Sequence, residues 1–352
     1  MVAPAPSRRL RSLALGGVGG CLLTACAAPS AGGGPVFYRP AAIGSQATFD
    51  PLRSGAQYVL DGAQIGDAGT GDFSAKLKAV WDHLREPVHT IEHDEGWRDF
   101  VNSELLPIDP DHFGDSRAIL PNVFLHTIGG GMLYRKYAEW FEAHDVPLPW
   151  LSAGFVAMAT EVLGEASEKP VTDDTDEIAD VLIYRPLGLW LFQDPARSCW
   201  VRDHLRPVDW PYQLVWDVDD GEFANVGMNY ALRPTLFGGD DTLPFVYLGI
   251  TNLFGLSHRV GCGDRLSWGA GTATVTVKPV ELRWSAGVFY DRDDSLLASL
   301  IVNGADGYAV RANVYPGVLF GSTVPIGLFV GVDDDGRGTI GAQWVLPIGV
   351  AR

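Results

Sequence analysis

The chain has 352 residues, with 43 acidic and 26 basic side chains, a formal net charge of −17 and 47% hydrophobic residues. This composition excludes a disordered chain and a polytopic helical membrane protein. The acidic excess argues against nucleic-acid binding, which requires a basic face. Glycine (42 residues) and proline (23 residues) are enriched, which favours a turn-rich, largely β architecture.

Residues 1–25 have the features of a secretory signal peptide. Three arginines between positions 8 and 11 precede a short apolar stretch, 13–23, that several glycines interrupt. The tail Leu-Thr-Ala-Cys at 23–26 resembles a bacterial lipobox, which implies that Cys26 is lipidated and becomes the mature N-terminus. Dual acylation gives stable membrane anchoring, and Ala27 implies the outer membrane by the same analogy. The alternative is an ordinary cleaved signal with a coincidental cysteine.

The segment that follows, 26–36, is rich in Ala, Pro, Ser and Gly, which predicts a flexible tether. Removal of the signal takes away three arginines and no acidic residue, so the mature chain is more negative still. The remaining cysteines, Cys199 and Cys262, could form a disulfide in an oxidising envelope compartment, or stay as two buried free thiols.

Residues 37–118 form a mixed, acidic segment with a weak helical pattern over 73–84. Within it, His89-Thr-Ile-Glu92-His93 matches the inverted zinc-protease pattern. On a helix the two histidines would share one face, but Glu161 or Glu165 would have to supply a third ligand. The surrounding residues are acidic and irregular, so we expect a solvated stretch and no metal.

Residues 119–193 form an apolar helical segment. It contains three stretches with helical spacing, at 118–140, 149–163 and 178–192. None of them reaches the ~20 uninterrupted apolar residues that a membrane span needs. We therefore expect about three apolar helices that pack against one another or against a sheet.

Residues 210–352 change to an alternating pattern, which predicts β-strands. Turn signals separate most of the candidate strands, which are 213–217, 224–232, 245–251, 267–277, 281–291, 296–302, 308–315, 326–332 and 339–346. Short turns predict an antiparallel meander of about 8–10 strands, most economically closed into a β-barrel. The expected fold class is thus α+β, with the helical segment packed with this meander or barrel.

The direction of the apolar strand face decides the class of protein. In a soluble barrel it would point inward, and in an outer-membrane barrel it would point to lipid. A lipid-tethered, ligand-binding barrel requires Leu282, Trp284, Val310 and Val314 to point inward. Periodicity alone leaves both directions open.

The helical segment carries an ordered set of polar residues: an Asn, a His followed by small residues and Tyr, a Glu-containing helix, and Asp-x5-Pro-x-Gly. This order resembles the domain-of-unknown-function 3943 family of Gram-negative envelope proteins, and strand motifs at 225–230 and 244–247 extend the resemblance over roughly residues 118–290. The resemblance implies an envelope location but no reaction. The residues that it marks are Asn122, His126, Tyr134, Glu161, Asp180 and Gly188.

Brought together, His126, Glu161, Glu165 and Asp180 could form an acid–base site, a metal site or a buried polar network that fixes helix packing. The sequence shows no nucleophile signature and no phosphate-cradling loop, so the structural network is favoured and no cofactor is expected. The glycines 129–131 next to His126 are costly in a helix, which predicts the close approach of a partner backbone or a ligand.

These observations favour a non-enzymatic, outer-membrane-associated lipoprotein that serves envelope structure, assembly or transport of an apolar molecule. The expected partners are the membrane, through the lipid anchor, and a lipid or other apolar ligand. Two alternatives remain: a lipid- or cell-wall-modifying enzyme that uses His126 and the carboxylates, and the lipid-tethered ligand-binding barrel.

Overall fold

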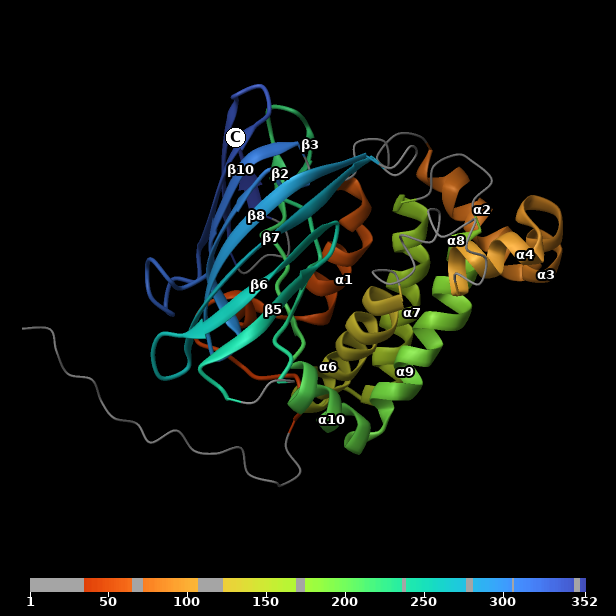
Figure 1. Cartoon of the computed structure of the whole chain (residues 1–352), viewed down its shortest axis with the longest axis horizontal. Coiled ribbons are helices and arrows are strands. Elements are labelled where there is room, and N and C mark those ends of the chain that lie inside the picture. Colours follow the sequence, from red (N-terminus) through yellow and green to blue (C-terminus); the bar gives the residue numbers. More distant parts are fainter. Residues whose placement is uncertain are drawn as a thin grey trace, which may run out of the picture. The chain divides into compact units, whose positions relative to one another are not determined.

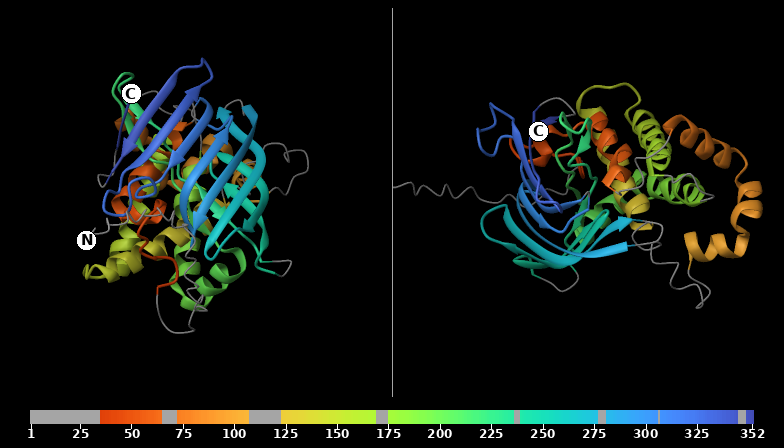
Figure 2. Two further views of the ribbon diagram at one scale, coloured as in Figure 1. Left: turned by 90° about the vertical axis from the view of Figure 1, so that its left-hand side faces the viewer. Right: turned by 90° about the horizontal axis from the view of Figure 1, so that it is seen from above.

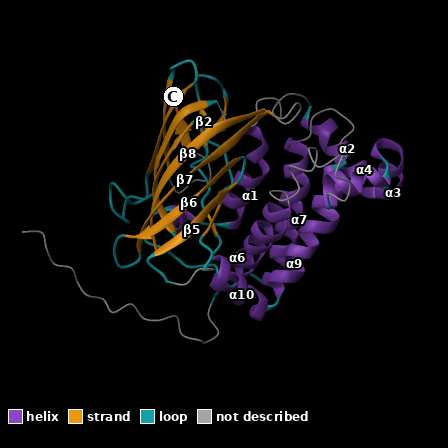
Figure 3. Ribbon diagram, viewed as in Figure 1, coloured by secondary structure: helices purple, strands orange, loops and turns teal. Residues whose placement is uncertain are grey.

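The helices and strands form two layers, and the helical layer precedes most of the sheet in the sequence (Figures 1 and 3). The computed structural model describes residues 35–64, 72–106, 123–168, 175–235, 239–276, 281–305, 307–344 and 349–352. All of them belong to the unit Gly34–Arg352. The fold is α+β, as the sequence predicts.

The helical layer is built from short and medium helices, several of which begin at an aspartate cap. Asp50 and Asp194 each cap a helix that starts with proline, a residue that fits the first helical position. The α-helices are α1 (Pro51–Val59), α2 (Phe73–Arg85), α3 (Pro87–Thr90), α4 (Trp97–Phe100), α6 (Gly130–Ala143), α7 (Pro149–Glu168), α8 (Asp176–Ala179), α9 (Arg185–Gln193) and α10 (Pro195–Leu205). Four π-helical segments join them: η3 (Ile91–Glu95), η4 (Val101–Leu105), η7 (Phe124–Gly129) and η8 (Asp180–Tyr184).

The described residues of all three predicted apolar stretches, 123–140, 149–163 and 178–192, are helical, but the expectation of about three helices is too low. Helices α1, α3, α4 and α10 were not predicted; α3 and α4 have four residues each, which is too short to show a helical period. Within the described part of the chain, we find no helix with the length and apolar character that crossing a bilayer demands.

The strands form one sheet of 13 strands in the order β1-β4-β5-β6-β7-β8-β9-β10-β11-β12-β13-β2-β3. Their bounds are β1 (Val208–Asp209), β2 (Val215–Asp217), β3 (Glu222–Ala224), β4 (Tyr230–Leu232), β5 (Thr242–Leu248), β6 (Thr251–Arg259), β7 (Asp264–Thr276), β8 (Glu281–Arg292), β9 (Ser295–Val302), β10 (Tyr308–Val314), β11 (Gly327–Asp333), β12 (Gly338–Gln343) and β13 (Gly349–Ala351). From β4 to β13 each strand pairs antiparallel with the next, which confirms the meander.

The predicted closure into a barrel is wrong for the described strands. The sheet is open, with β1 at one end and β3 at the other. These end strands have two and three residues, too short to complete a wall. In addition, β13 pairs with β2 in parallel, so the sheet is mixed. Strand β6 was also not predicted. Gly255 on one face and His258 on the other weaken the apolar–polar alternation that marks a strand.

The sheet curves around α1, and the helices lie on its concave side (Figure 2). The Gln57 side chain of α1 forms hydrogen bonds with the backbone on either side of β2 and β3. The Gln57 amide donates to the Tyr212 carbonyl at 2.5 Å, and the Gly227 amide donates to the Gln57 side-chain oxygen at 3.3 Å. The inner side of the sheet therefore has polar partners in the helical layer.

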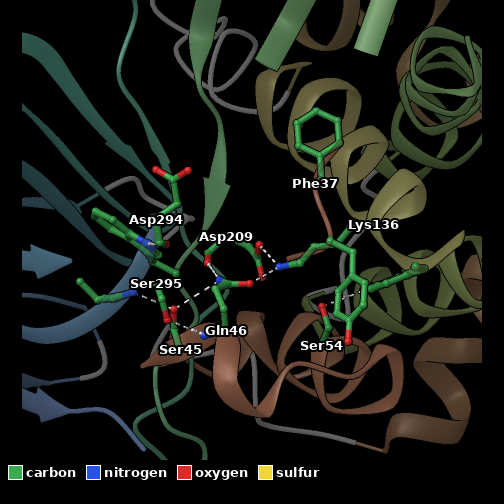
Figure 4. Close-up of polar contacts among 12 residues, drawn as sticks. Phe37, Ser45, Gln46, Ser54, Lys136, Asp209, Asp294 and Ser295 are labelled. Carbon is green, nitrogen blue, oxygen red and sulfur yellow. Dashed lines mark hydrogen bonds and ion pairs between the residues drawn. The ribbon is translucent and has the colours of Figure 1, made fainter. Parts of the chain in front are cut away.

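A buried lysine links the helical layer to the sheet. Lys136 on α6 is 1% exposed, and its Nζ donates to Asp209 Oδ1 and to Gln46 Oε1, each at 2.5 Å (Figure 4). Gln46 in turn donates to the Asp209 carbonyl at 2.9 Å, and its backbone amide donates to Ser295 Oγ at 3.2 Å. Because a buried ammonium is costly without such partners, this network fixes how α6 sits on β1 and β9.

The outer side of the sheet faces the viewer in the left panel of Figure 2. It carries exposed apolar side chains. Trp284, Leu282 and Val310 are 63%, 50% and 37% exposed. These three side chains therefore point outward, whereas a ligand-binding barrel requires them to point inward. Val314 is half-buried.

Candidate functional site

Five helical elements bring a group of titratable side chains together beneath the sheet. We call this group the His126 cluster; it consists of Tyr58 (α1), His126 (η7), Glu161 and Glu165 (α7), Asp180 (η8) and Arg185 (α9). Glu161 and Glu165 share one face of α7 through their i, i+4 spacing. His126 and Asp180 both lie in π-helical turns, which occur frequently at functional sites because they reorient side chains.

Glu161 is the centre of the cluster and is fully buried. Its Oε1 lies 2.5 Å from His126 Nδ1, and its Oε2 accepts a hydrogen bond of 2.6 Å from the Tyr58 hydroxyl. Arg185 forms an ion pair with the same carboxylate. Because an ionised carboxylate only accepts hydrogen bonds, His126 donates through Nδ1, which leaves Nε2 as the free acceptor.

The Nε2 atom of His126 lies on the side of Asp180. It lies 3.6 Å from Asp180 Oδ2. Glu165 also belongs here, because ligand atoms of His126, Glu161 and Glu165 all lie within 4.8 Å of one another. The structure thus brings together the four titratable residues that the sequence selected.

Burial sets the protonation of this cluster. It lowers the pKa of His126, although the charge of Asp180 opposes the change, so the imidazole is neutral at pH 7. Burial also raises the pKa of the Glu165 carboxyl well above its usual range, and the negative charge of Asp180 adds to the effect. The protonated, uncharged form of Glu165 is therefore favoured relative to that of a solvent-exposed glutamate.

Glycines allow the helices around the cluster to touch. A Cβ on Gly188 would lie 2.6 Å from the Thr127 carbonyl oxygen, and one on Gly131 would lie 2.8 Å from the Gly188 carbonyl oxygen. A Cβ on Gly129 would lie 2.7 Å from the ring of Tyr230, on β4. The predicted close approach of a partner backbone at the glycine triplet is confirmed.

Some of the selected residues lie elsewhere. Tyr134 is buried, but it packs edge-on against Trp150, with 5.8 Å between ring centroids, and is not part of the His126 cluster. Cys26 and Asn122 lie outside the described residues, so lipidation and the role of Asn122 stay predictions. The structure joins no disulfide between Cys199, which is partly buried, and Cys262, which is exposed.

Among the described residues, the histidines of the inverted zinc-protease pattern belong to no group of three or more potential metal ligands. His89 and His93 place their rings 3.9 Å apart, and His93 Nδ1 donates to the His89 carbonyl at 2.9 Å. The proposed third ligands, Glu161 and Glu165, belong to the His126 cluster. Among the described residues, the only group of three or more His, Cys, Asp or Glu side chains placed to hold a metal is His126, Glu161 and Glu165.

Two members of the cluster, Tyr58 and Arg185, were missed. Tyr58 lies in the segment 37–118, where no sequence motif includes this residue. Arg185 could have been selected from the sequence, because it is a charged residue inside an otherwise apolar helical stretch. Such a residue needs a buried counter-ion. Its partner could not be read from the sequence, since Glu161 lies on a different helix.

The fold and the cluster define an α+β protein with a curved open sheet, whose concave side covers a histidine–carboxylate cluster. Comparisons of the chain with protein-family models, with curated proteins and with solved structures found no match. The resemblance to the domain-of-unknown-function 3943 family therefore stays a prediction.

Proposed function

We propose that this protein is a lipid-anchored, outer-membrane lipoprotein that seats the outer face of its sheet against lipid and serves envelope structure, assembly or apolar-molecule transport. The observation that carries the proposal is the exposed apolar face of the sheet. Its large exposed side chains on β6 to β13 are Phe254, Leu256, Trp268, Leu282, Trp284, Val288, Leu300, Val310, Val330, Val332, Ile340 and Val350.

The register of the strands makes this face continuous. One outward-facing side chain from each strand forms a row across β6 to β12, namely Leu256, Trp268, Val288, Leu300, Ala312, Val330 and Ile340. Monomeric soluble proteins rarely expose a contiguous apolar patch larger than a few hundred Å². A face of this extent needs a partner, and an apolar sheet face suits lipid.

The opposite side of the same strands is not suited to lipid. Ser285 and Asp291 on β8 and Arg311 on β10 are buried beneath the sheet. Arg311 donates to the Ala305 carbonyl at 2.5 Å, and its guanidinium lies 4.3 Å from the Tyr212 ring centroid. This alternation, apolar outward and polar inward, is the pattern of a membrane β-sheet.

Charged residues gather where the strands end. Arg292, at the end of β8, pairs with Asp264, at the start of β7, with 2.6 Å between Nε and Oδ1. Such pairs suit the water-facing rim of a sheet that contacts lipid. A lipid on Cys26 would hold the domain near the bilayer, because the ten residues to Val36 reach at most roughly 35 Å.

The proposal is tested with the full chain carrying Cys26→Ser, so that membrane binding reports the sheet and not the anchor. We expect this protein to float with vesicles of phosphatidylethanolamine and phosphatidylglycerol. Adding Trp284→Asp should lower the vesicle-bound fraction about tenfold, because a carboxylate enters the lipid-facing surface.

The matched control is Trp81→Asp, which changes a tryptophan of similar exposure on α2, in the helical layer: 56% for Trp81 and 63% for Trp284. Its vesicle-bound fraction should equal that of Cys26→Ser alone. Equal flotation of the two aspartate variants, or a parent protein that stays in the aqueous fraction, would contradict the proposal.

A lipid- or cell-wall-modifying enzyme is a second candidate, favoured by one observation. His126 is oriented by Glu161 through Nδ1 and presents Nε2 toward Asp180, an arrangement suited to a general base. Incubation of the protein with outer-membrane lipid or peptidoglycan should then yield a mass-shifted product, and His126→Gln should abolish its formation. Identical product spectra for the folded variant and the parent would exclude this function.

A further inference from the structure

Four arginines gather at the edge of the sheet where β6 ends and β7 begins. We call them the rim arginines: Arg206, which caps the end of α10, Arg233, which follows β4, Arg259, the last residue of β6, and Arg265, near the start of β7. They are close enough that burial, and then the charges of the other three, lower the pKa of Arg265. This edge therefore concentrates guanidinium groups, although the chain as a whole carries a net charge of −17.

Arg233 engages two of the nearby carboxylates by itself. Its Nη2 donates to Asp291 Oδ1 at 2.6 Å, and its Nη1 donates to Asp294 Oδ1 at 2.9 Å. Of the two carboxylates that precede β5, Asp241 is exposed, so water and salt screen its charge. Asp240 is the carboxylate that meets the other three rim arginines.

The contacts of Asp240 show that three guanidinium groups reach one point. Arg206 Nη2 donates to Asp240 Oδ1 at 2.7 Å, and Arg265 Nη2 donates to the Asp240 carbonyl oxygen at 2.5 Å. Arg259 Nη2 lies 4.0 Å from Asp240 Oδ2, which is too long for a hydrogen bond. The hydrogen bond and charge of Arg206, and then the charges of Arg259 and Arg265, lower the pKa of Asp240. The three side chains are therefore placed to surround one small anion.

Arg265 carries the charge that these contacts leave unbalanced. It is 7% exposed, and its Nη1 is buried without a hydrogen-bond partner among the described residues. Asp291 lies opposite Arg265 on β8, but Arg233 engages it, and Arg265 forms no ion pair within the described part of the chain. Arg259 lies directly opposite Arg265 on β6, and like charges in this position destabilise a sheet. A buried guanidinium without a counter-ion is costly, so an additional anion would stabilise this arrangement.

We propose that Arg206, Arg259 and Arg265 bind a phosphate group, either the phosphodiester of a lipid headgroup or a soluble phosphate. Guanidinium groups suit phosphate because their paired N–H donors match its oxygens. The phosphate would take the place of the Asp240 carboxylate, which is 57% exposed and can turn to solvent. The site itself is independent of the membrane-seating proposal, and only a lipid source of the phosphate rests on it.

The position of the site suits a lipid headgroup. On β6, Arg259 follows the exposed Leu256 by three residues, and on β7, Arg265 precedes the exposed Trp268 by three residues. At roughly 3.3 Å per residue, the arginines lie about 10 Å along the strands from the apolar outer face. The polar headgroups of a bilayer border its hydrocarbon core. A lipid whose chains contact the sheet would therefore present its phosphate near this edge.

Arg292 supplies a matched control at the same edge of the sheet. Its side chain is 49% exposed, compared with 43% for Arg259. Unlike Arg259, it has a carboxylate partner of its own: Nε donates to Asp264 Oδ1 at 2.6 Å, and Nη2 donates to Asp264 Oδ2 at 3.1 Å. Substitution of Arg292 should therefore leave phosphate binding intact.

The experiment uses the full chain with Cys26→Ser in a maltoside detergent at fixed salt. Calorimetry measures its binding of inorganic phosphate and, separately, of glycerophosphoglycerol, the water-soluble headgroup of phosphatidylglycerol. We expect one bound anion per chain. Arg259→Gln and Arg265→Gln should each weaken binding at least about tenfold, because each removes a charged donor, whereas Arg292→Gln should bind as the parent does. Far-UV circular dichroism checks folding, and the half-exposed Arg259 keeps the test valid if the buried Arg265 variant fails to fold.

The two probes distinguish the sources of the phosphate. Tighter binding of glycerophosphoglycerol would assign the site to a lipid headgroup, and tighter binding of inorganic phosphate would assign it to a soluble phosphate. Either result supports the site. The titration contains no vesicles, so its outcome does not depend on whether the sheet seats against lipid.

Asp240→Asn gives a readout that a purely structural ion-pair network would not give. It should strengthen phosphate binding about three- to tenfold, because it removes the competing carboxylate. Weaker binding by this variant would overturn the proposal. No saturable binding of either probe by the parent, parent-like binding by folded Arg259→Gln, or an equal loss in Arg292→Gln would also overturn it.

Discussion

Replacing Arg185 by methionine is expected to lower the free energy of unfolding by about 3–5 kcal/mol, because a fully buried carboxylate loses its cation. Glu161 has no exposed surface, and Arg185 is 1% exposed, so water cannot replace the ion pair. Methionine keeps most of the length and apolar contact of the arginine stem. Denaturant unfolding followed by tryptophan fluorescence measures the change.

The double variant Arg185→Met with Glu161→Gln is the control. If the cost comes from the unpaired charge, the second substitution should recover a large part of the loss, although each single change is destabilising. The glutamine can still accept the hydrogen bond from Tyr58. A double variant whose losses simply add would show that Arg185 acts through packing and not through the charge of Glu161.

Replacing Gly188 by alanine is expected to cost about 1–3 kcal/mol, because the new methyl group meets backbone rather than a side chain that can move. Its Cβ would lie 2.6 Å from the Thr127 carbonyl oxygen, which belongs to the π-helical segment that carries His126. The substitution should therefore separate α9 from η7, and thermal unfolding measures the loss.

Gly154 supplies the matched comparison, because it also lies inside a helix but has space beside it. The nearest atom to a Cβ there is Tyr134 Cε2, at 3.8 Å. Gly154→Ala should leave stability unchanged or raise it by up to about 1 kcal/mol, as helix propensity predicts. If the two alanine variants had the same stability, the close contact at Gly188 would not be a constraint on packing.

The helical predictions succeeded where the apolar period was long. The stretch 149–163 lies entirely within α7, and the face that carries Glu161 and Glu165 follows from their i, i+4 spacing. The stretches 118–140 and 178–192 contain η7 with α6, and η8 with α9, but their π-helical turns were not predicted. A π-helical turn contains one more residue than an α-helical turn, and contacts with neighbouring elements hold that residue in place. The local sequence does not show these contacts.

The candidate site was only partly predictable. Four of its titratable residues stood out because polar side chains in apolar helical stretches need partners. Which partner each one finds depends on how helices cross, so the link from Glu161 to Tyr58 and Arg185 required the tertiary structure. Tyr134 shows the opposite case, since it has a similar sequence context but packs against Trp150 in the core.

The sequence by itself determined the α+β class, the meander and the alternation of apolar and polar side chains along each strand. These are local properties, because a strand repeats every two residues whatever lies beside it. It did not determine which side of the sheet the helices cover, nor whether the sheet closes. Trp284 is exposed because the helices cover the opposite, concave side of the sheet (Figure 2), where Asp291 is buried in an ion pair with Arg233. Short strands at both ends leave the sheet open. Only contacts between elements far apart in the chain decide such questions.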